Sequence, residues 1–340
     1  MTVRSGLVAL KENLVYVVVA SLIVGLTTGQ FIGASTRGLL RASVVPILFV
    51  MIYPMMINVD VREVVGIRDH AGPVLASLAV NFLVTPVLAL GLARLFFAGD
   101  VGYAVGLYFV ALVPTSGMTA AWTGLADGDL EAALVAMAVN LLVAVAVLPA
   151  YLSVLIPGSV GFEPTRLYRQ LAQVVVVPML AGAVTRRLLH RRYGADGFRR
   201  LKPALGGVSS LGVTLIVFVA TAMRSTAILA DPVASLSVIV PLVGFYAGTL
   251  AVGAVVGRVL FDHARGTALV YATSMRNLSI ALAVVVAADE LPPAAVLPIA
   301  LGYLLQPPLG AVYVHYRRDV IGEGLTLREA VQRLVRGESA

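Results

Sequence analysis

The chain has 340 residues, of which 59% are hydrophobic and 13% are charged, and its mean hydropathy is +0.94. Soluble domains carry roughly 45–50% apolar and about 25% charged residues, so this composition excludes a soluble protein and predicts a polytopic membrane protein. The sequence has no cysteine, which excludes disulfides, thiolate metal sites and thiol redox chemistry.

Ten segments are long and apolar enough to cross a bilayer, for which a helix needs about 20 residues. In chain order they are 14–34, 38–58, 71–97, 101–125, 131–156, 170–189, 204–223, 233–260, 267–288 and 293–316. The first begins near Asn13 and is too long for the apolar part of a signal peptide, so we expect a first span there. The connections are short except at 59–70, 157–169 and 190–203. We therefore expect an all-α fold of ten transmembrane helices.

The basic residues indicate the topology of these spans. The termini and the even-numbered connections hold 18 of the 25 Lys and Arg residues, and the odd-numbered connections hold 6. Positive charge is in excess on the cytoplasmic side of a membrane, so we expect a protein of the cell (inner) membrane with both termini in the cytoplasm. Because topology accounts for the net charge of +7, no nucleic-acid partner is expected. The tail 317–340 is either an amphipathic helix on membrane lipid or a solvated segment.

The ten spans divide into two halves of five, residues 1–156 and 157–316, and an odd number of spans per half gives the halves opposite orientations. A shift of 158 residues places span 1 on span 6 and span 4 on span 9, and it aligns Thr115-Ser116 with Thr273-Ser274. We therefore expect two inverted five-helix repeats, which is the plan of many secondary transporters.

Span 4 contains the sequence LVPTSGMTAAW. Pro114 removes a backbone donor, and Gly117 loosens the helix three residues later. The hydroxyls of Thr115 and Ser116 can bond the freed backbone groups or a ligand. Irregular backbone at membrane depth occurs only where protein or water covers it. We therefore expect a break that lines a cavity, with a simple proline kink as the alternative.

Span 9 contains YATSMRNLSIALAVVVAA, with one permanent charge at Arg276. No proline or glycine interrupts this stretch, so the expectation of a second break near 273–277 rests on the repeat. Its polar residues are Thr273, Ser274, Arg276, Asn277 and Ser279. We expect the substrate or ion site where discontinuous spans 4 and 9 cross, near the bilayer midplane.

The acidic residues and the four histidines lie at span ends or in connections. A membrane-embedded hydrolase needs an acid–base pair or a metal cluster, so no enzymatic activity, cofactor or metal site is expected. Arg276 then has three available partners: an anionic substrate, carbonyl groups at the ends of broken helices, or water in a cavity. Because an ionisable residue inside a membrane usually marks a pathway, we place Arg276 in the substrate site.

Two asparagines also lie inside spans, Asn81 in span 3 and Asn140 in span 5. Each can hydrogen-bond between helices, and Asn140, one span after the first break, has the better claim to the site. Gln306 precedes PPLG in span 10, and the single Trp122 either anchors an interface or walls the cavity.

These features resemble the bile acid:sodium symporter superfamily, whose members have inverted five-span halves and polar breaks in spans 4 and 9. The segment VPTSGMTAAWTGLADGDLEAALVAMAVN, residues 113–140, is most similar to the arsenite-efflux permease branch. The matching positions are Pro114, Ser116, Met118, Trp122, Asp127-Gly128-Asp129 and Asn140. The resemblance covers about 1–316 and implies a secondary transporter.

The chain departs from both branches of this superfamily at residues that bind substrate or ion. The arsenite branch has a cysteine in span 4 where this chain has Thr115, and a hydroxyl does not replace a soft thiolate ligand. The same branch has an acidic residue in span 9 where this chain has Ser279. In the bile acid branch, the sodium-coordinating glutamate corresponds to Ala272 and a glutamine to Arg276. We hypothesise that Arg276 supplies the positive charge that sodium supplies in these relatives.

The sequence thus predicts a secondary transporter that moves a small anionic solute by alternating access, with a proton or sodium as the coupling ion. Arsenite or metalloid efflux without the thiol is one alternative. A non-transporting membrane sensor or partner protein, in which Arg276 locks the crossing shut, is the other. Transport predicts a water-reachable cavity at Arg276, whereas the locked alternative predicts that protein groups satisfy all five of its donors.

Overall fold

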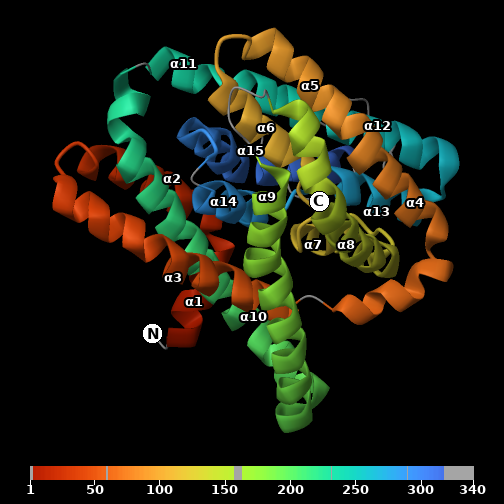
Figure 1. Ribbon diagram of the computed structural model, residues 1–340. Coiled ribbons are helices and arrows are strands. Elements are labelled where there is room, and N and C mark those ends of the chain that lie inside the picture. The colour runs from red at the N-terminus through yellow and green to blue at the C-terminus, as the bar shows by residue number, and fades with distance from the viewer. Residues whose placement is uncertain (1–2, 59, 157–162, 231, 289, 318–340) are drawn as a thin grey trace.

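The computed structural model describes residues 3–58, 60–156, 163–230, 232–288 and 290–317 and shows a bundle of helices (Figure 1). The first half of the chain forms α1 (Val3–Glu12), α2 (Leu14–Thr28), α3 (Ala34–Asn58), η1 (Val61–Arg68), α4 (Ala71–Ala79), η2 (Val80–Val84), α5 (Thr85–Phe96), α6 (Val101–Leu112), α7 (Met118–Leu125) and α8 (Leu130–Leu155). The second half forms α9 (Pro164–Leu171), η4 (Ala172–Val176), α10 (Val177–Ala230), α11 (Pro232–Ser237), α12 (Ile239–Leu260), α13 (His263–Ser274), α14 (Leu278–Ala287), η5 (Pro293–Ala295) and α15 (Val296–His315). The tail 317–340, for which the sequence leaves an amphipathic helix and a solvated segment as alternatives, lies outside the described residues, apart from Arg317.

Six helical segments within the described ranges are long and apolar enough to span a membrane. They are Ser35–Asn58, Ala71–Phe96, Leu130–Leu155, Thr165–Met223, Ile239–Leu260 and Pro293–His315. α1 and α2 make a seventh candidate if they count as one span, although the two helices are bent by 82°. α6 and α14 are shorter apolar helices. The chain is therefore a multi-pass membrane protein, as the composition predicts.

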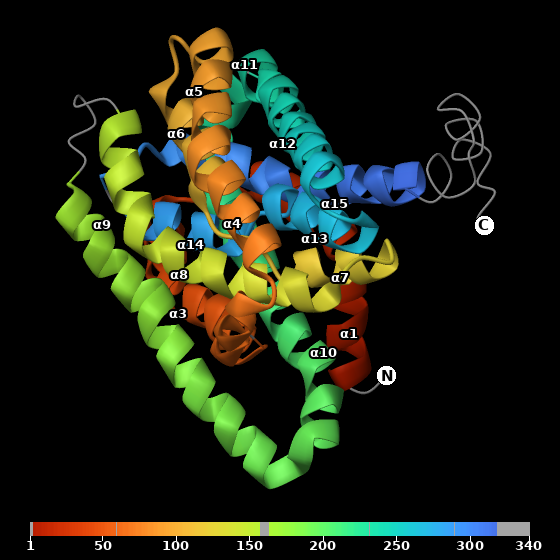
Figure 2. The ribbon, with the colours of Figure 1, turned by 90° about the vertical axis from the view of Figure 1, so that its right-hand side faces the viewer.

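Two of the three longer connections between the predicted spans are helical. Residues 190–203 continue α10, which extends over 54 residues and leaves the helical conformation at Gly194, with φ of 70° and ψ of 179°. Glycine adopts this left-handed conformation without strain because it has no Cβ. The predicted gap is therefore a turn between two arms of α10, seen as the vertex of the green V in Figure 2. Residues 61–68 form the 3₁₀ helix η1 inside the first long connection.

The helices form two groups that adjoin each other. α10 contacts α1, α2 and α3, and these four elements lie together in Figure 1. In the other group, α12 contacts α13 and α15, while α13 also contacts α4, α7 and α8. α14 contacts α3 and α15 contacts α2, which joins the two groups. α13 therefore lies among helices from both halves of the chain.

Glycine lets both arms of α10 approach α3 closely. A Cβ atom placed on Gly182 would lie 2.8 Å from the backbone carbonyl carbon of Met56, and one placed on Gly212 would lie 2.6 Å from the Cα atom of Met51. Small residues at helix interfaces permit such packing inside membranes, where van der Waals contact holds helices together. Any larger residue at either position would force the two helices apart.

Candidate functional site

Two helices are interrupted inside the bundle. Residues 113–117, which include Pro114 and Gly117, separate α6 from α7. Residues 275–277 separate α13 from α14. Proline and glycine account for the first gap locally, but nothing in the local sequence of the second gap breaks a helix, so its cause lies in the partners of its backbone.

Side-chain caps stabilise the starts of three of these four helix segments. The Oδ1 atom of Asp100 accepts a hydrogen bond from the backbone N–H three residues later at 3.2 Å, and Asp262 does the same at the start of α13 at 3.0 Å. At the start of α14, the Oδ1 atom of Asn277 accepts from the N–H three residues later at 3.3 Å. These contacts satisfy donors that a helix start leaves unpaired, so Asn277 acts here as a cap.

The two gaps cross and hydrogen-bond to each other. Thr115 and Arg276 form an isolated antiparallel bridge. The N–H of Ser116 donates to the carbonyl oxygen of Met275 at 2.9 Å, and the N–H of Asn277 donates to the carbonyl oxygen of Pro114 at 2.8 Å. Each gap therefore supplies backbone partners that the other lost on leaving the helix, which makes the irregular backbone tolerable inside a membrane. We call residues 113–117 and 275–277 the crossing.

Arg276 is buried at the crossing, with 1% of its surface exposed. Gln306 of α15 clamps its peptide group: the Arg276 N–H donates to Gln306 Oε1 at 2.7 Å, and Gln306 Nε2 donates to the Arg276 carbonyl oxygen at 3.2 Å. The guanidinium carbon lies 5.8 Å from the ring centre of Phe245 in α12, within the range of a cation–π contact. Among the residues that the structure describes, no carboxylate lies within ion-pair distance of Arg276.

Several buried polar atoms at the crossing lack a hydrogen-bond partner in the described part of the chain. They are Nε and Nη2 of Arg276, Oγ1 of Thr115 and the hydroxyl of Tyr246. Tyr246 interacts electrostatically with Arg276, and Thr115 forms the backbone bridge with it. More than about 90% of buried polar groups in proteins are hydrogen-bonded. Among the described residues, Arg276 is therefore surrounded by buried polar atoms whose hydrogen-bonding capacity is unused.

The other hydroxyls predicted for the site have partners within the protein. Thr273 and Ser274 donate to carbonyl oxygens of their own helix, at 3.0 Å and 2.7 Å. Ser116 Oγ accepts from the N–H of Met118 at 3.2 Å, and Ser279 shares a hydrogen bond of 2.9 Å with a tyrosine of α15. The structure therefore brings Thr115 and Arg276 together with free polar atoms, while these four hydroxyls serve the local backbone or packing.

Asn140 of α8 belongs to a buried polar network that reaches α13. Its Nδ2 atom donates to the hydroxyl of Ser77 and to the carbonyl oxygen of Ala136, both at 2.8 Å. Its Oδ1 atom accepts from Nδ2 of Asn81 at 2.8 Å, and the same Nδ2 donates to the carbonyl oxygen of Ala272 at 2.9 Å. Asn81, which the sequence predicts to hydrogen-bond between helices, is the member of this network that bonds α13 directly. Both amide hydrogens of Asn140 are thus donated to protein acceptors, and its Oδ1 atom accepts one bond.

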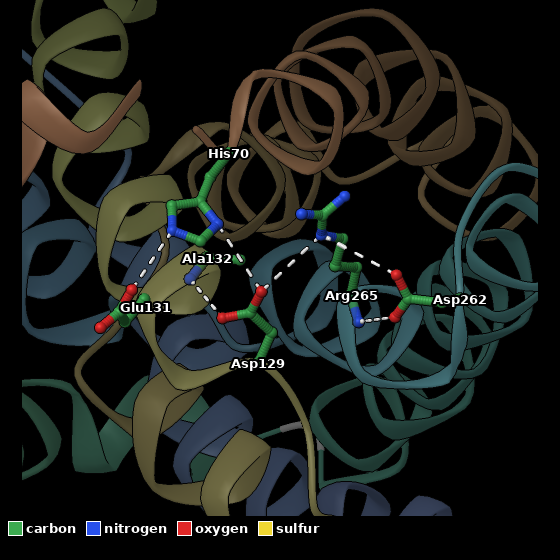
Figure 3. Close-up of polar contacts among 6 residues, drawn as sticks. All are labelled: His70, Asp129, Glu131, Ala132, Asp262 and Arg265. Atoms are coloured by element: carbon green, nitrogen blue, oxygen red, sulfur yellow. Dashed lines mark hydrogen bonds and ion pairs between the residues drawn. The ribbon is translucent and has the colours of Figure 1, made fainter. Parts of the chain in front are cut away.

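Charged side chains tie the segment after α7 to the start of α13 on one face of the bundle (Figure 3). The N–H of Asp129 donates to the carbonyl oxygen of Ala264 at 2.9 Å. Its carboxylate lies 3.6 Å from Nδ1 of His70 and 3.9 Å from Nε of Arg265, and it also caps α8. These contacts hold the end of α7 near the start of α13, and the crossing lies at the opposite ends of the same two helices.

Two cavities of about 290 and 300 Å³ lie elsewhere in the bundle. The first lies between α6, α10 and α15, and residues such as Asp100, Tyr103 and Thr221 line it. The second lies between α12, α13 and the end of α15. Neither is lined by a residue of the crossing. Arg276 is buried, and neither of these two cavities is the water-reachable cavity that transport predicts at Arg276.

Sequence reasoning did not assign three residues of the site. Gln306 stands out as an amide in an apolar span, and this signal identifies it as polar without identifying its partner. Phe245 and Tyr246 give no signal, because aromatic residues are common in membrane helices. Within the described ranges, no group of three or more His, Asp or Glu side chains is arranged to hold a metal ion.

Long apolar helices, two interrupted helices that cross inside the protein and a buried arginine at their crossing are features of multi-pass transporters. The model of the Sodium Bile acid symporter family matches residues 45–231, and the chain belongs to this family. It is 24% identical over 298 residues to Arsenical-resistance protein Acr3 of Corynebacterium glutamicum, which covers 83% of this chain and 80% of that protein. It is 25% identical over 252 residues to Arsenical-resistance protein Acr3 of Alkaliphilus metalliredigens, which covers 66% of this chain and 68% of the relative. The resemblance deduced from the sequence is confirmed, and the family is one of transporters rather than enzymes.

Proposed function

We propose that the protein is a secondary transporter that moves a small anionic solute across the cell membrane by alternating access, with Arg276 as the fixed positive charge of the site. Membership of the symporter family supports the transporter class. The observation that supports an anionic solute concerns Arg276: its buried guanidinium nitrogens Nε and Nη2 lack acceptors within the described residues. An anion that reaches them gains charge-assisted hydrogen bonds, which are stronger than bonds between neutral groups.

The unpaired nitrogens favour direct contact with the solute over a purely structural role for Arg276. A guanidinium that held the carbonyl ends of the half-helices would donate to those carbonyls, and Nε and Nη2 have no such acceptor in the part of the chain described. The locked, non-transporting alternative requires protein acceptors for all five donors, which the same two atoms also argue against. In the proposal, Arg276 takes the place of the coupling sodium ion, and Thr115 and Tyr246 complete the polar surroundings.

The enclosed crossing is one state of the proposed transport cycle. Transport by alternating access requires a second state in which the donors face water or solute. In that state one group of helices has moved against the other, for example α10 with α1 to α3 against the group around α13.

We also infer a topology of ten spans in two inverted repeats, 1–156 and 157–316, with both termini in the cytoplasm. In this topology α6 with α7 and α13 with α14 each form one interrupted span, and Gly194 divides α10 between two spans. The capping residues Asp100 and Asp262 are 162 positions apart, and the bridged residues Thr115 and Arg276 are 161 apart. These spacings support a repeat shift of 161 or 162 residues in place of 158.

The test is transport into proteoliposomes against a panel of small inorganic and carboxylic anions, with and without a sodium gradient. Arg276→Gln should reduce transport of the true substrate by about tenfold or more, since a charge-assisted hydrogen bond contributes about 1.5–3 kcal/mol. Arg191→Gln, which removes an exposed arginine of α10, is the charge-matched control and should transport normally. Full activity of Arg276→Gln on every substrate would exclude Arg276 from the mechanism. Strict sodium dependence of the wild type would exclude the replacement of sodium by Arg276.

Efflux of arsenite or another metalloid is a second candidate, because the two relatives reported above are arsenical-resistance proteins. Thr115 stands at the position of the branch's cysteine, so a hydroxyl would have to serve where a thiolate serves in that branch. Expression in an arsenite-sensitive host tests this candidate directly. A gain in tolerance with the wild type supports it. A gain only with Thr115→Cys would show that the scaffold is retained and that the ligand has been lost.

A further inference from the structure

A second basic cavity lies apart from the crossing, at the end of α12, the start of α13 and the end of α15. Its volume is about 300 Å³, and its basic lining residues are Arg258, His263 and Arg317. Tyr313 and Tyr316 add two phenol groups. Figure 2 shows the ends of α12, α13 and α15 on the same side of the molecule. No residue of 113–117 or 275–277 lines it, so this cavity is separate from the proposed transport site.

Arg317 is the most deeply buried charge of this cavity, with 6% of its surface exposed. Its Nη1 atom lies 2.6 Å from Nδ1 of His263, and its Nη2 atom donates to the His263 carbonyl oxygen at 3.4 Å. Because a guanidinium only donates hydrogen bonds, the imidazole nitrogen is the acceptor. The Nε atom is buried and has no acceptor in the described residues. Arg317 therefore lines a cavity with a donor still to be satisfied.

The acidic groups nearby do not neutralise this cavity by direct contact. Asp262 also lines it. The Oδ1 atom of Asp262 caps α13, and its Oδ2 atom lies 3.8 Å from Nε of Arg265, a residue that does not line the cavity. Asp127 acts on Arg317 only through its field, and no ion pair of Arg317 occurs among the described side chains. The lining thus has more positive than negative charge.

We propose that this cavity binds a phosphate group, carried either by an anionic lipid headgroup or by free phosphate. Arg258 follows the apolar part of α12, and Tyr313 and Tyr316 end α15, so the cavity lies where membrane spans meet the headgroup region. Basic pockets between transmembrane helices at this depth suit lipid phosphates. The guanidinium of Arg317 presents its planar set of donors to such a group, and phosphate matches that geometry.

Binding of an anion in this cavity is coupled to protonation of His263. Partial burial and the positive charge of Arg317 lower the pKa of His263, while the charges of Asp127 and Asp262 act in the opposite direction. A phosphate group would offset the repulsion from Arg317 and would replace the imidazole as an acceptor for its donors. Binding therefore favours the protonated imidazole, and protonation favours binding.

The first arm of the test uses the full chain in a neutral detergent and titrates inorganic phosphate at constant ionic strength against chloride. Phosphate should raise the thermal unfolding midpoint of the wild type, since a ligand that binds only the folded state stabilises it. Arg317→Gln and Arg258→Gln should need about tenfold more phosphate, or more, for the same effect. Arg258 is exposed, so Arg258→Gln keeps the test valid if Arg317→Gln does not fold. Arg191→Gln is the matched control and should respond as the wild type does.

The second arm separates the two sources of phosphate. The same variants are placed in nanodiscs of phosphatidylcholine alone or with added phosphatidylglycerol. If the ligand is a lipid headgroup, phosphatidylglycerol should stabilise the wild type more than Arg258→Gln, and free phosphate should add little. If the ligand is free phosphate, it should stabilise the wild type equally in both nanodiscs. Equal responses of the wild type and Arg258→Gln in both arms, or no response of the wild type in either, would overturn the proposal.

Discussion

Gln306→Leu tests whether the crossing depends on the amide clamp from α15. The side chain is 2% exposed and makes two hydrogen bonds to the peptide group of Arg276, at 2.7 Å and 3.2 Å. Leucine has a similar size and cannot form either bond. The substitution therefore leaves a buried N–H and a buried carbonyl oxygen unsatisfied at the point where the two interrupted helices meet.

The expected loss of stability follows from these two groups. A typical hydrogen bond contributes about 1 kcal/mol net, and a buried polar group left without a partner costs about 1–3 kcal/mol. Two such groups give about 3 kcal/mol for Gln306→Leu. Gln170→Leu removes one bond, from Gln170 Nε2 to the carbonyl oxygen of Ala287 at 3.1 Å. It also removes the buried Oε1 atom, which has no partner in the part of the chain that the structure describes, so it should cost about 1 kcal/mol or less. Gln30→Leu changes an exposed side chain and should cost close to nothing.

The assay is the thermal unfolding midpoint of the three purified variants and the wild type in one detergent. The midpoints should decrease in the order Gln30→Leu, Gln170→Leu, Gln306→Leu, and the last should lie roughly 5 °C below the wild type. Transport by Gln306→Leu should fall as well, because Arg276 would lose its fixed position. A midpoint for Gln306→Leu equal to that of Gln30→Leu would refute the view that this clamp stabilises the crossing.

Two further predictions concern helix packing and pH. Gly253→Ala should destabilise the protein by about 1–3 kcal/mol, because the added Cβ would lie 2.6 Å from the Thr273 hydroxyl. In the control Gly244→Ala the added Cβ would meet its nearest atom at 3.5 Å, so this variant should be tolerated. Equal unfolding midpoints for the two variants would contradict the prediction. The pKa of His263 is lowered, first by burial and then by the charge of Arg317, so the folded state favours the neutral ring. The contribution of the neutral ring to stability is present above the unfolded pKa of about 6.5 and is lost as pH falls below it. The unfolding midpoint should therefore decline more steeply from about pH 6.5 to 5 in the wild type than in His263→Gln. Parallel curves for the two proteins would argue against this contribution.

The first interruption could be read from the sequence, and the second could not be read locally. Pro114 and Gly117 weaken a helix whatever surrounds them. Residues 275–277 contain neither proline nor glycine, and they leave the helix where residues 113–117 and Gln306 supply partners for their backbone. The expectation of a second break rests on internal symmetry, and a shift of 158 residues does not pair Thr115 with Arg276, the two residues that the bridge joins.

The charge of the candidate site stands out in the sequence, whereas its hydrogen-bond partners do not. A charge in an apolar stretch marks Arg276 from the sequence alone. The sequence does not tell which polar neighbours remain free, and it grouped Thr273 and Ser274 with Arg276 although their hydroxyls bond their own helix. The side chain of Asn140 hydrogen-bonds to Asn81 and Ser77, partners that the sequence does not identify.

The sequence by itself determined the membrane environment, the helical class and the presence of a permanent charge in an apolar stretch, because hydrophobic length and residue type are properties of a single stretch of chain. Only the tertiary structure decided that Gln306 holds the Arg276 peptide group, that Nε and Nη2 of Arg276 have no acceptor among the described residues, and that Arg317 lines a separate basic cavity. The physical reason is that hydrogen-bond satisfaction inside a membrane is settled between residues from distant spans. A polar side chain therefore becomes structural or functional according to which neighbours the fold leaves it.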